Sequence, residues 1–191
     1  MKKTILALPI LFAVIAYSVF AAEDGGKPEG DDGIHAGQYV GSAEFERLKT
    51  LVGRWESEMQ MPGAGGSEGG KGTTIKVATE YRMAANGTVI VERNFPDTPK
   101  EMISVYHDRG GKLWMTHYCA KGNQPQMSLT KATDGVIALE LVEGSLDSPD
   151  ESHMHAVSIA FDGADAMSQT WTMYEGGKET MAHTMTYRRV R

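Results

Sequence analysis

The stretch "IKVATEYRMAANGTVIV", residues 75–91, decides the fold, because it contains two alternating segments and the turn that joins them. Side chains suited to a buried face alternate with polar ones from Ile75 to Met83, which is typical of a half-buried β-strand. The pair Asn86-Gly87 favours a type I′ turn between antiparallel strands. The stretch therefore predicts a tight β-hairpin whose second strand begins near Val89.

The same alternation extends outward from this hairpin, back to Trp55 and forward to Arg191. The further predicted strands are 101–107, 112–120, 125–132, 135–143, 153–161, 166–174 and 178–190, separated by short glycine-containing turns. A meander of about ten strands would expose two long edges if it stayed open, so we predict an all-β, antiparallel up-and-down barrel. A flattened two-sheet sandwich is the alternative.

One short helix is predicted in front of the strands. Ser42 is a suitable N-cap, and Phe45, Leu48 and Val52 recur on one helical face. Gly53 is expected to end this helix.

The N-terminus has the pattern of a secretory signal. Lys2 and Lys3 precede an apolar run over residues 5–20, and the small residues Ala21 and Ala22 follow. We predict a signal peptide over 1–21, a flexible glycine- and acid-rich spacer over 22–41, and a single β-barrel domain over 42–191. The mature protein would then be exported, to the periplasm or the extracellular space. An uncleaved membrane anchor is the alternative.

Charge and cysteine content narrow the range of partners. The formal net charge is −6, and losing Lys2 and Lys3 with the signal would make it −8, so nucleic acid and anionic membrane surfaces are not expected as partners after cleavage. Cys119 is the only cysteine, so the fold is expected to depend on its core and not on an internal disulfide.

Four stretches carry a resemblance to a protein family: "FERLKTLVGRW" at 45–55, "VIVERNFPDTPKEMISVYH" at 89–107, "LWMTHYCAKGNQPQM" at 113–127 and the closing "TMTYRRV". Together they resemble a group of small exported bacterial proteins of unassigned activity with a lipocalin-like, or calycin, β-barrel. The resemblance implies a ten-stranded barrel with a helix at one end. It carries no catalytic residues.

A more distant resemblance is to the nitrobindin-like haem barrels, which open with a Gly-x-Trp element comparable to Gly53-Arg54-Trp55. That family holds ferric haem on one histidine near the chain end, and His183 occupies a loosely similar place. The resemblance therefore implies haem as a possible cofactor on His183. The sequence departs from that family after the tryptophan, where "ESEMQMPG" replaces a glycine-rich signature.

The predicted strand 112–120 carries the only cysteine. Leu113, Met115, His117 and Cys119 share one face, but the opposite face also carries large residues, so the pattern does not decide which face points inward. Side chains two apart on a strand are about 6.5 to 7 Å apart, too far for a direct hydrogen bond between His117 and Cys119. A buried, unreactive thiol is favoured over a nucleophile.

A turn follows this strand, and it could raise Asn123 and Gln124 to the barrel mouth, where their amides could orient a ligand. The histidines alternate with apolar residues, so several imidazoles could line one cavity. The candidate ligand-binding residues are therefore His117, Cys119, Asn123, Gln124, Trp171 and His183. No catalytic set and no metal-ligand spacing is present in the sequence.

These observations favour an exported small-molecule-binding β-barrel, with an apolar or amphipathic ligand in its cavity. Two alternatives stay open: a haem-binding barrel or a haem- or Cys-His-dependent enzyme, and a structural envelope protein without a ligand. An enzyme is the less favoured interpretation.

Overall fold

A computed structural model describes residues 39–61 and 73–191, and these residues form one short helix and ten strands. The predicted signal peptide and residues 22–38 of the predicted spacer lie outside the described residues. The elements are α1 (Ala43–Lys49), β1 (Gly53–Met61), β2 (Thr73–Ala84), β3 (Val89–Asn94), β4 (Met102–Arg109), β5 (Lys112–Tyr118), β6 (Gln126–Ala132), β7 (Val136–Leu141), β8 (His153–Phe161), β9 (Ala166–Glu175) and β10 (Lys178–Arg189). No helix in this part of the chain is long and apolar enough to span a membrane.

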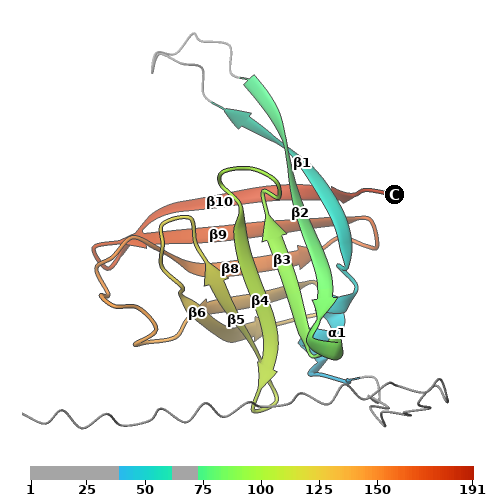
Figure 1. The fold of residues 1–191 in the computed structure, drawn as a ribbon, viewed down its shortest axis with the longest axis horizontal. Helices are drawn as coiled ribbons and strands as arrows, with labels where there is room; N and C mark the ends of the chain where they lie inside the picture. The colour runs from blue at the N-terminus through green and yellow to red at the C-terminus, as the bar shows by residue number, and fades with distance from the viewer. Residues whose placement is uncertain (1–38, 62–72) are drawn as a thin grey trace, which may run out of the picture. The chain divides into compact units, whose positions relative to one another are not determined.

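The strands form a closed antiparallel barrel in which each strand pairs with the next one along the chain (Figure 1). Closure comes from β1 and β10, where Trp55 pairs with Arg189 and Glu56 with Arg188. The predicted up-and-down barrel is confirmed, and the sandwich alternative is wrong.

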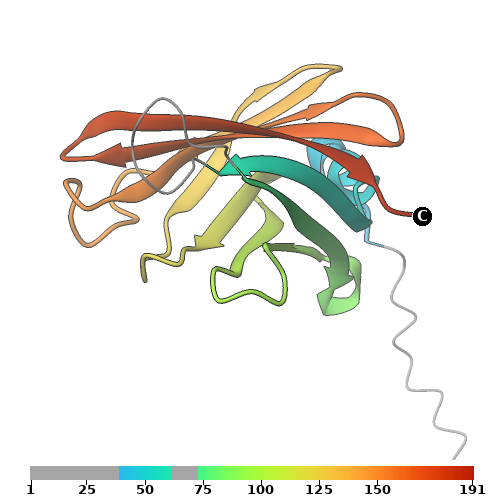
Figure 2. The same ribbon diagram turned by 90° about the horizontal axis from the view of Figure 1, so that it is seen from above.

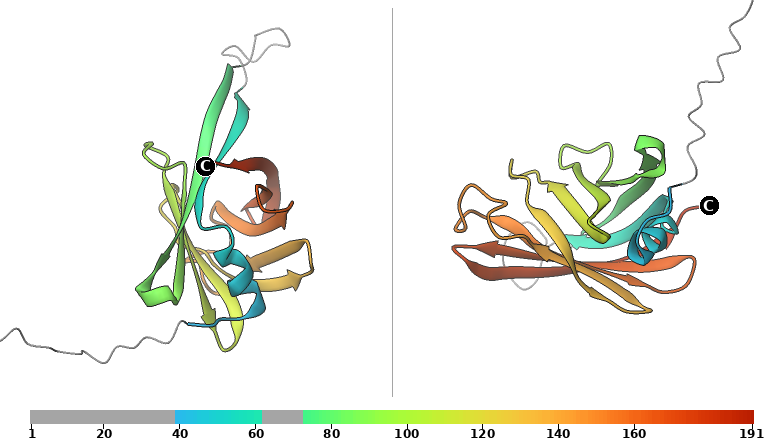
Figure 3. Two further views of the ribbon diagram at one scale, coloured as in Figure 1. Left: turned by 90° about the vertical axis from the view of Figure 1, so that its right-hand side faces the viewer. Right: turned by 90° about the horizontal axis from the view of Figure 1, so that it is seen from below.

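The helix α1 forms where the sequence predicts it, and it lies against one end of the barrel (Figure 3). The Ser42 hydroxyl accepts a hydrogen bond from the Phe45 amide at 3.1 Å, and Phe45 and Leu48 are fully buried. The predicted helical face is wrong at Val52, which is 38% exposed, because the helix ends at Lys49 and the next turn buries Leu51 instead.

Residues 39–41, which the sequence assigned to the spacer, pack against the barrel domain. The Tyr39 ring lies edge-on to the Phe45 ring at 5.5 Å, and the Tyr39 hydroxyl donates to the Asp108 carboxylate at 3.1 Å. The described domain therefore begins by residue 39.

The connection between β2 and β3 is longer than the predicted two-residue turn. Ala84 pairs with Val89, so residues 85–88 form the loop, and Ala85, Asn86 and Gly87 all have positive φ (46°, 53° and 85°). Asn86 and Gly87 tolerate this conformation readily, which explains their place in the loop although the turn type differs.

The two ends of the barrel differ. At one end α1 covers the interior, and the Arg47 guanidinium donates to the Thr133 carbonyl oxygen in the β6–β7 turn at 2.6 Å. The connections β3–β4, β5–β6, β7–β8 and β9–β10 lie at the opposite end, which we call the mouth (Figure 2). The interior near α1 is apolar, with Trp55, Ile90 and Leu113 fully buried.

Candidate functional site

A carboxyl group lies in the middle of the barrel interior. Glu92 on β3 is fully buried and accepts hydrogen bonds from the Thr79 hydroxyl at 3.0 Å and the Tyr106 hydroxyl at 2.7 Å. The Gln169 amide nitrogen donates to the same carboxyl group and contacts the Tyr81 hydroxyl. We call these five residues, Thr79, Tyr81, Glu92, Tyr106 and Gln169, the Glu92 cluster.

Burial shapes the acidity of the tyrosines in this cluster. Desolvation, followed by the charge of Glu92, raises the pKa of Tyr81 and of Tyr106 well above the ordinary value for tyrosine. Both hydroxyls therefore keep their protons at neutral pH and can donate. The cluster is internally satisfied, since each of its buried side chains has a hydrogen-bond partner inside it.

A second set of polar side chains in the barrel has buried atoms without partners. Asn94 follows Glu92 on the same face of β3 and is 2% exposed, and neither its amide nitrogen nor its amide oxygen has a hydrogen-bond partner among the described residues. The same holds for Nε2 of His117 and Nε2 of His183. We call Asn94, His117 and His183 the unpartnered layer.

His117 on β5 is 1% exposed, and its Nδ1 lies 3.0 Å from the Ser104 hydroxyl. Its ring contacts the Trp171 ring on β9, with 4.7 Å between centroids. Desolvation lowers the pKa of His117 to about 4, so the ring is neutral at physiological pH. A neutral imidazole whose Nδ1 faces a hydroxyl can still donate or accept one hydrogen bond through Nε2.

Trp171 lies next to residues of both the Glu92 cluster and the unpartnered layer. Its indole nitrogen donates to the Gln169 side-chain oxygen at 3.1 Å, and its backbone pairs with His183 on β10. The structure therefore brings three of the predicted ligand-binding residues, His117, Trp171 and His183, to one region of the interior.

The other three predicted ligand-binding residues lie at the rim. Cys119 is partly exposed and is not the fully buried thiol that the sequence favoured, and its backbone amide donates to the Asn123 carbonyl oxygen at 3.0 Å. The Asn123 side-chain nitrogen donates to the Ser152 carbonyl oxygen at 2.9 Å, so it ties two rim loops together. The exposed Gln124 side chain turns back to the Gly122 carbonyl oxygen at 2.9 Å.

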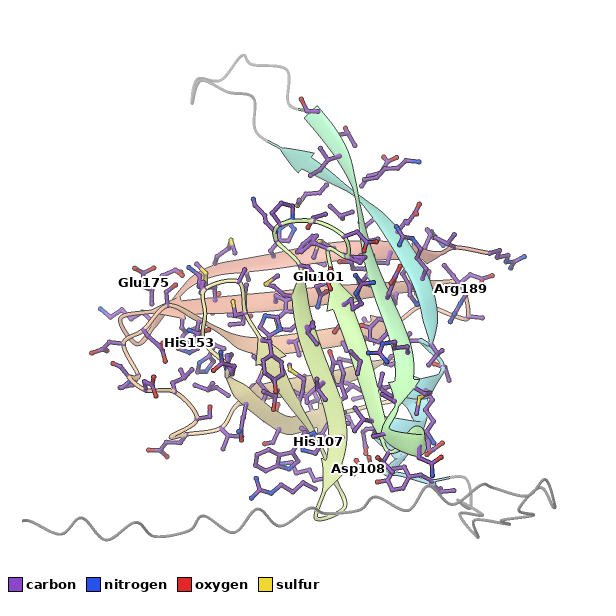
Figure 4. All side chains as sticks on the ribbon, viewed as in Figure 1. Glu101, His107, Asp108, His153, Glu175 and Arg189 are labelled. Carbon is purple, nitrogen blue, oxygen red and sulfur yellow. The ribbon has the colours of Figure 1, made fainter. Side chains whose placement is uncertain are left out.

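The expectation that several histidines line one cavity is wrong for His107, His153 and His155. On β4 the buried positions are Ser104 and Tyr106, which places His107 on the outer face. The register of β8 shifts between Met154 and Ala156, so His153 and His155 do not follow the inward parity of Val157. His155 instead stacks on Tyr174, with 3.8 Å between ring centroids. Figure 4 shows His107 on β4 and His153 at the start of β8.

His183 is the residue on which a haem could be held, because its Nε2 is buried without a partner. The neighbouring space is already occupied in part by Trp171, which pairs with His183 and contacts His117. The donor atom suits a ferric haem, and Trp171 is the neighbour that such a group would meet. Among the described residues, no cluster of three or more His, Cys, Asp or Glu side chains is placed to hold a metal ion.

The sequence analysis missed Glu92, Asn94, Tyr106 and Gln169. A signal for the first two was present, because Ile90, Glu92 and Asn94 share one face of the segment "VIVERN". An acid and an amide at inward positions next to a buried isoleucine indicate a polar interior. Tyr106 and Gln169 gave no comparable signal, since each meets Glu92 only after the strands close.

The comparisons with known proteins support the fold. No family model and no curated protein matches the chain. Among solved structures, the crystal structure of Rv2717c from M. tuberculosis is similar, with a TM-score of 0.50 and 17% sequence identity over 80% of this chain and 100% of that chain. At that identity the likeness shows a shared fold alone, and the chain is a ten-stranded antiparallel β-barrel with such a structural neighbour.

Proposed function

We propose that the protein binds a small molecule in the mouth-side half of the barrel, against the unpartnered layer. The observation that carries this proposal is the side chain of Asn94, which is almost fully buried with both amide atoms lacking partners. A buried polar group without a hydrogen bond costs about 1–3 kcal/mol, so a native chain retains one mainly where another molecule supplies the bond.

The surrounding residues favour an uncharged, amphipathic ligand. Trp171, which contacts His117 and pairs with His183, is buried and offers apolar contact. Asn94 and the neutral His117 offer hydrogen bonds, and no lysine or arginine is among the buried residues of the described chain. A carboxylate ligand would therefore enter this region without a compensating charge, whereas a neutral carbonyl, hydroxyl or amide would satisfy both side chains.

Native mass spectrometry of the purified protein tests the proposal. We expect a bound mass of a few hundred daltons, as is usual for a small-molecule ligand. Asn94→Leu should lose that mass, while the matched control Gln124→Ala at the exposed rim should retain it. An apoprotein mass for the wild type under all expression conditions would instead support a structural envelope protein with no ligand.

Haem is a second candidate, favoured by the free Nε2 of His183 and by the resemblance to nitrobindin-like barrels. When bound, a ferric haem would supply redox chemistry and coordination of small gases, while His183 would hold it. Titration with ferric haem should sharpen the Soret band in the wild type and in His107→Ala, but not in His183→Ala. The absence of a spectral change in all three proteins would exclude haem as the ligand.

We also propose that the protein works outside the cytoplasm, in the periplasm or extracellular space, as the lysines and apolar run at the N-terminus predict. The protein recovered from a bacterial host should begin at Ala22 or Glu23 by N-terminal sequencing. Recovery of Met1 in a membrane fraction would support the retained anchor instead. The calycin resemblance fits an exported binding barrel, and no catalytic role is proposed.

A further inference from the structure

A groove forms at the mouth end of the barrel, where β2 leaves β3. The pairing of these strands ends at Thr79 and Asn94, while β2 continues to Thr73 paired with β1 alone. The hairpin of β1 and β2 therefore projects beyond the barrel (Figures 1 and 3). Phe95 has a φ of 54° and its amide donates to the Ala78 carbonyl oxygen at 3.0 Å, so the chain turns away from β2 at that point.

The loop after β3 forms the second wall of the groove and is held by Arg93. The Arg93 guanidinium donates to both carboxylate oxygens of Glu101, at 2.8 and 2.9 Å, and to Asp97 at 2.9 Å. The Asp97 amide in turn donates to Glu101 at 2.9 Å. This bidentate arrangement gives the loop a defined shape, including the positive φ of Phe95 and Asp97. Glu101, immediately before β4, is labelled in Figure 4.

The groove has a volume of about 580 Å³, which falls in the range of about 300–1,000 Å³ that is usual for small-molecule sites. Most of its lining is apolar and comes from the projecting hairpin and the loop: Met59, Ile75, Val77, Ala78, Phe95, Pro96 and Pro99. Met59 and Phe95 also pack against the barrel core, so the floor of the groove is anchored to the core.

The lining of the groove contains more positively charged side chains than negatively charged ones. Glu56 is its one carboxylate and is paired with Arg54 at 3.4 Å, while Arg54 also binds Glu80. Lys76 and Lys100 line the groove as well, are exposed, and have no carboxylate within 4.0 Å among the described residues. The lining itself therefore carries three cations, Arg54, Lys76 and Lys100, against the one carboxylate of Glu56, although the net charge of the chain is −6.

We propose that this groove binds a free single-chain amphipathic anion, with its apolar chain on the hairpin and loop and its anionic head beside Lys76 and Lys100. The site is separate from the proposed interior site in its lining and in its charge. The interior has no buried lysine or arginine and suits an uncharged ligand, whereas the groove combines apolar lining with unpaired cations. Charge complementarity selects the head group, and apolar contact supplies affinity.

Displacement of dansyl-labelled undecanoate by laurate tests the groove. Removing both unpaired charges in Lys76→Gln/Lys100→Gln should weaken laurate binding by roughly tenfold or more, the loss expected for charge-assisted contacts. The matched double variant Lys131→Gln/Lys178→Gln removes two exposed lysines outside the groove and should bind laurate as the wild type does. Equal laurate affinity in all three proteins would overturn the proposal.

Two further experiments distinguish binding in the groove from binding in the barrel interior and from binding to a membrane. Ile75→Trp places a large ring in the groove and should abolish binding, while Asn94→Leu should leave it unchanged. Loss of laurate binding in Asn94→Leu but not in Ile75→Trp would show that laurate binds inside the barrel, and it would overturn the groove site. Dodecanol should displace the label more weakly than laurate. If the protein floats with phosphatidylglycerol vesicles but does not bind free laurate, the groove contacts a lipid surface. That result would overturn the proposal of a free amphipathic ligand.

Discussion

Two neighbouring polar groups occupy the barrel interior, and they differ in whether their atoms have partners. In the Glu92 cluster, hydroxyl and amide groups from β2, β4 and β9 converge on one carboxyl group. In the unpartnered layer, Asn94, His117 and His183 retain atoms with no hydrogen bond in the described structure. The comparison separates a group whose hydrogen bonds link the strands of the closed barrel from a group that we propose as the ligand site.

The largest expected effect is the loss of stability when the Glu92 cluster is disrupted. Glu92→Ala removes the shared acceptor of Thr79, Tyr106 and Gln169 and leaves their donors buried, so we expect the free energy of unfolding to fall by about 3 kcal/mol or more. Chemical denaturation measures this change. Glu140→Ala, which removes an exposed carboxylate on β7, should change stability by no more than about 0.5 kcal/mol.

Should Glu92→Ala not fold, Glu92→Gln provides the measurement, because its amide oxygen still accepts hydrogen bonds. We expect a smaller loss than for Ala. Full wild-type stability in both Glu92 variants would contradict a stabilising role for the cluster.

The second prediction concerns the pH dependence of stability in the unpartnered layer. Burial lowers the pKa of His117 from 6.5 to about 4, so the unfolded chain binds more protons than the folded one between those values. Stability should therefore be fully present above pH 6.5 and should decline as the pH falls toward 4, by roughly 3 kcal/mol from this group.

Unfolding free energies of the wild type and His117→Leu across this pH range test that slope. His117→Leu should be flatter, and His107→Leu, which changes an outer-face histidine, should follow the wild type. Burial and the charge of His153 also lower the pKa of His155, so a residual slope of the same sign is expected in every variant. Parallel curves for the wild type and His117→Leu would show that His117 does not titrate as its burial implies.

The smallest expected effect is a gain in the free energy of unfolding, whereas the first two predictions are losses. Asn94→Leu replaces an amide without partners by an apolar side chain of similar size, so the ligand-free protein should gain about 1 kcal/mol of stability. Thermal or chemical denaturation of the ligand-free protein measures the gain, with Gln124→Ala as a near-neutral rim control. A clear loss of stability would show that Asn94 has a partner in solution and would remove the main support for the interior ligand.

The candidate site was partly predictable. His117, Trp171 and His183 were named from the sequence and do lie together, whereas Cys119, Asn123 and Gln124 lie at the rim. His153 lies just before a register shift of β8 and His155 lies within it. A β-bulge of this kind changes which side chains face inward without changing the residue pattern. Strand parity in the sequence therefore could not place the two β8 histidines.

The sequence by itself determined the all-β class of fold, since alternation with short polar turns predicts a long antiparallel meander, and its exposed edges favour closure into a barrel. It also determined the cap at Ser42 and the burial of Phe45, which are local properties of one helical turn. The tertiary structure alone decided that Leu113, Met115 and His117 face inward, that Glu92 meets Tyr106 and Gln169, and that the hairpin of β1 and β2 leaves a groove beside it. Alternation defines two faces of a strand, but long-range pairing selects the inner one and the side chains that it meets there.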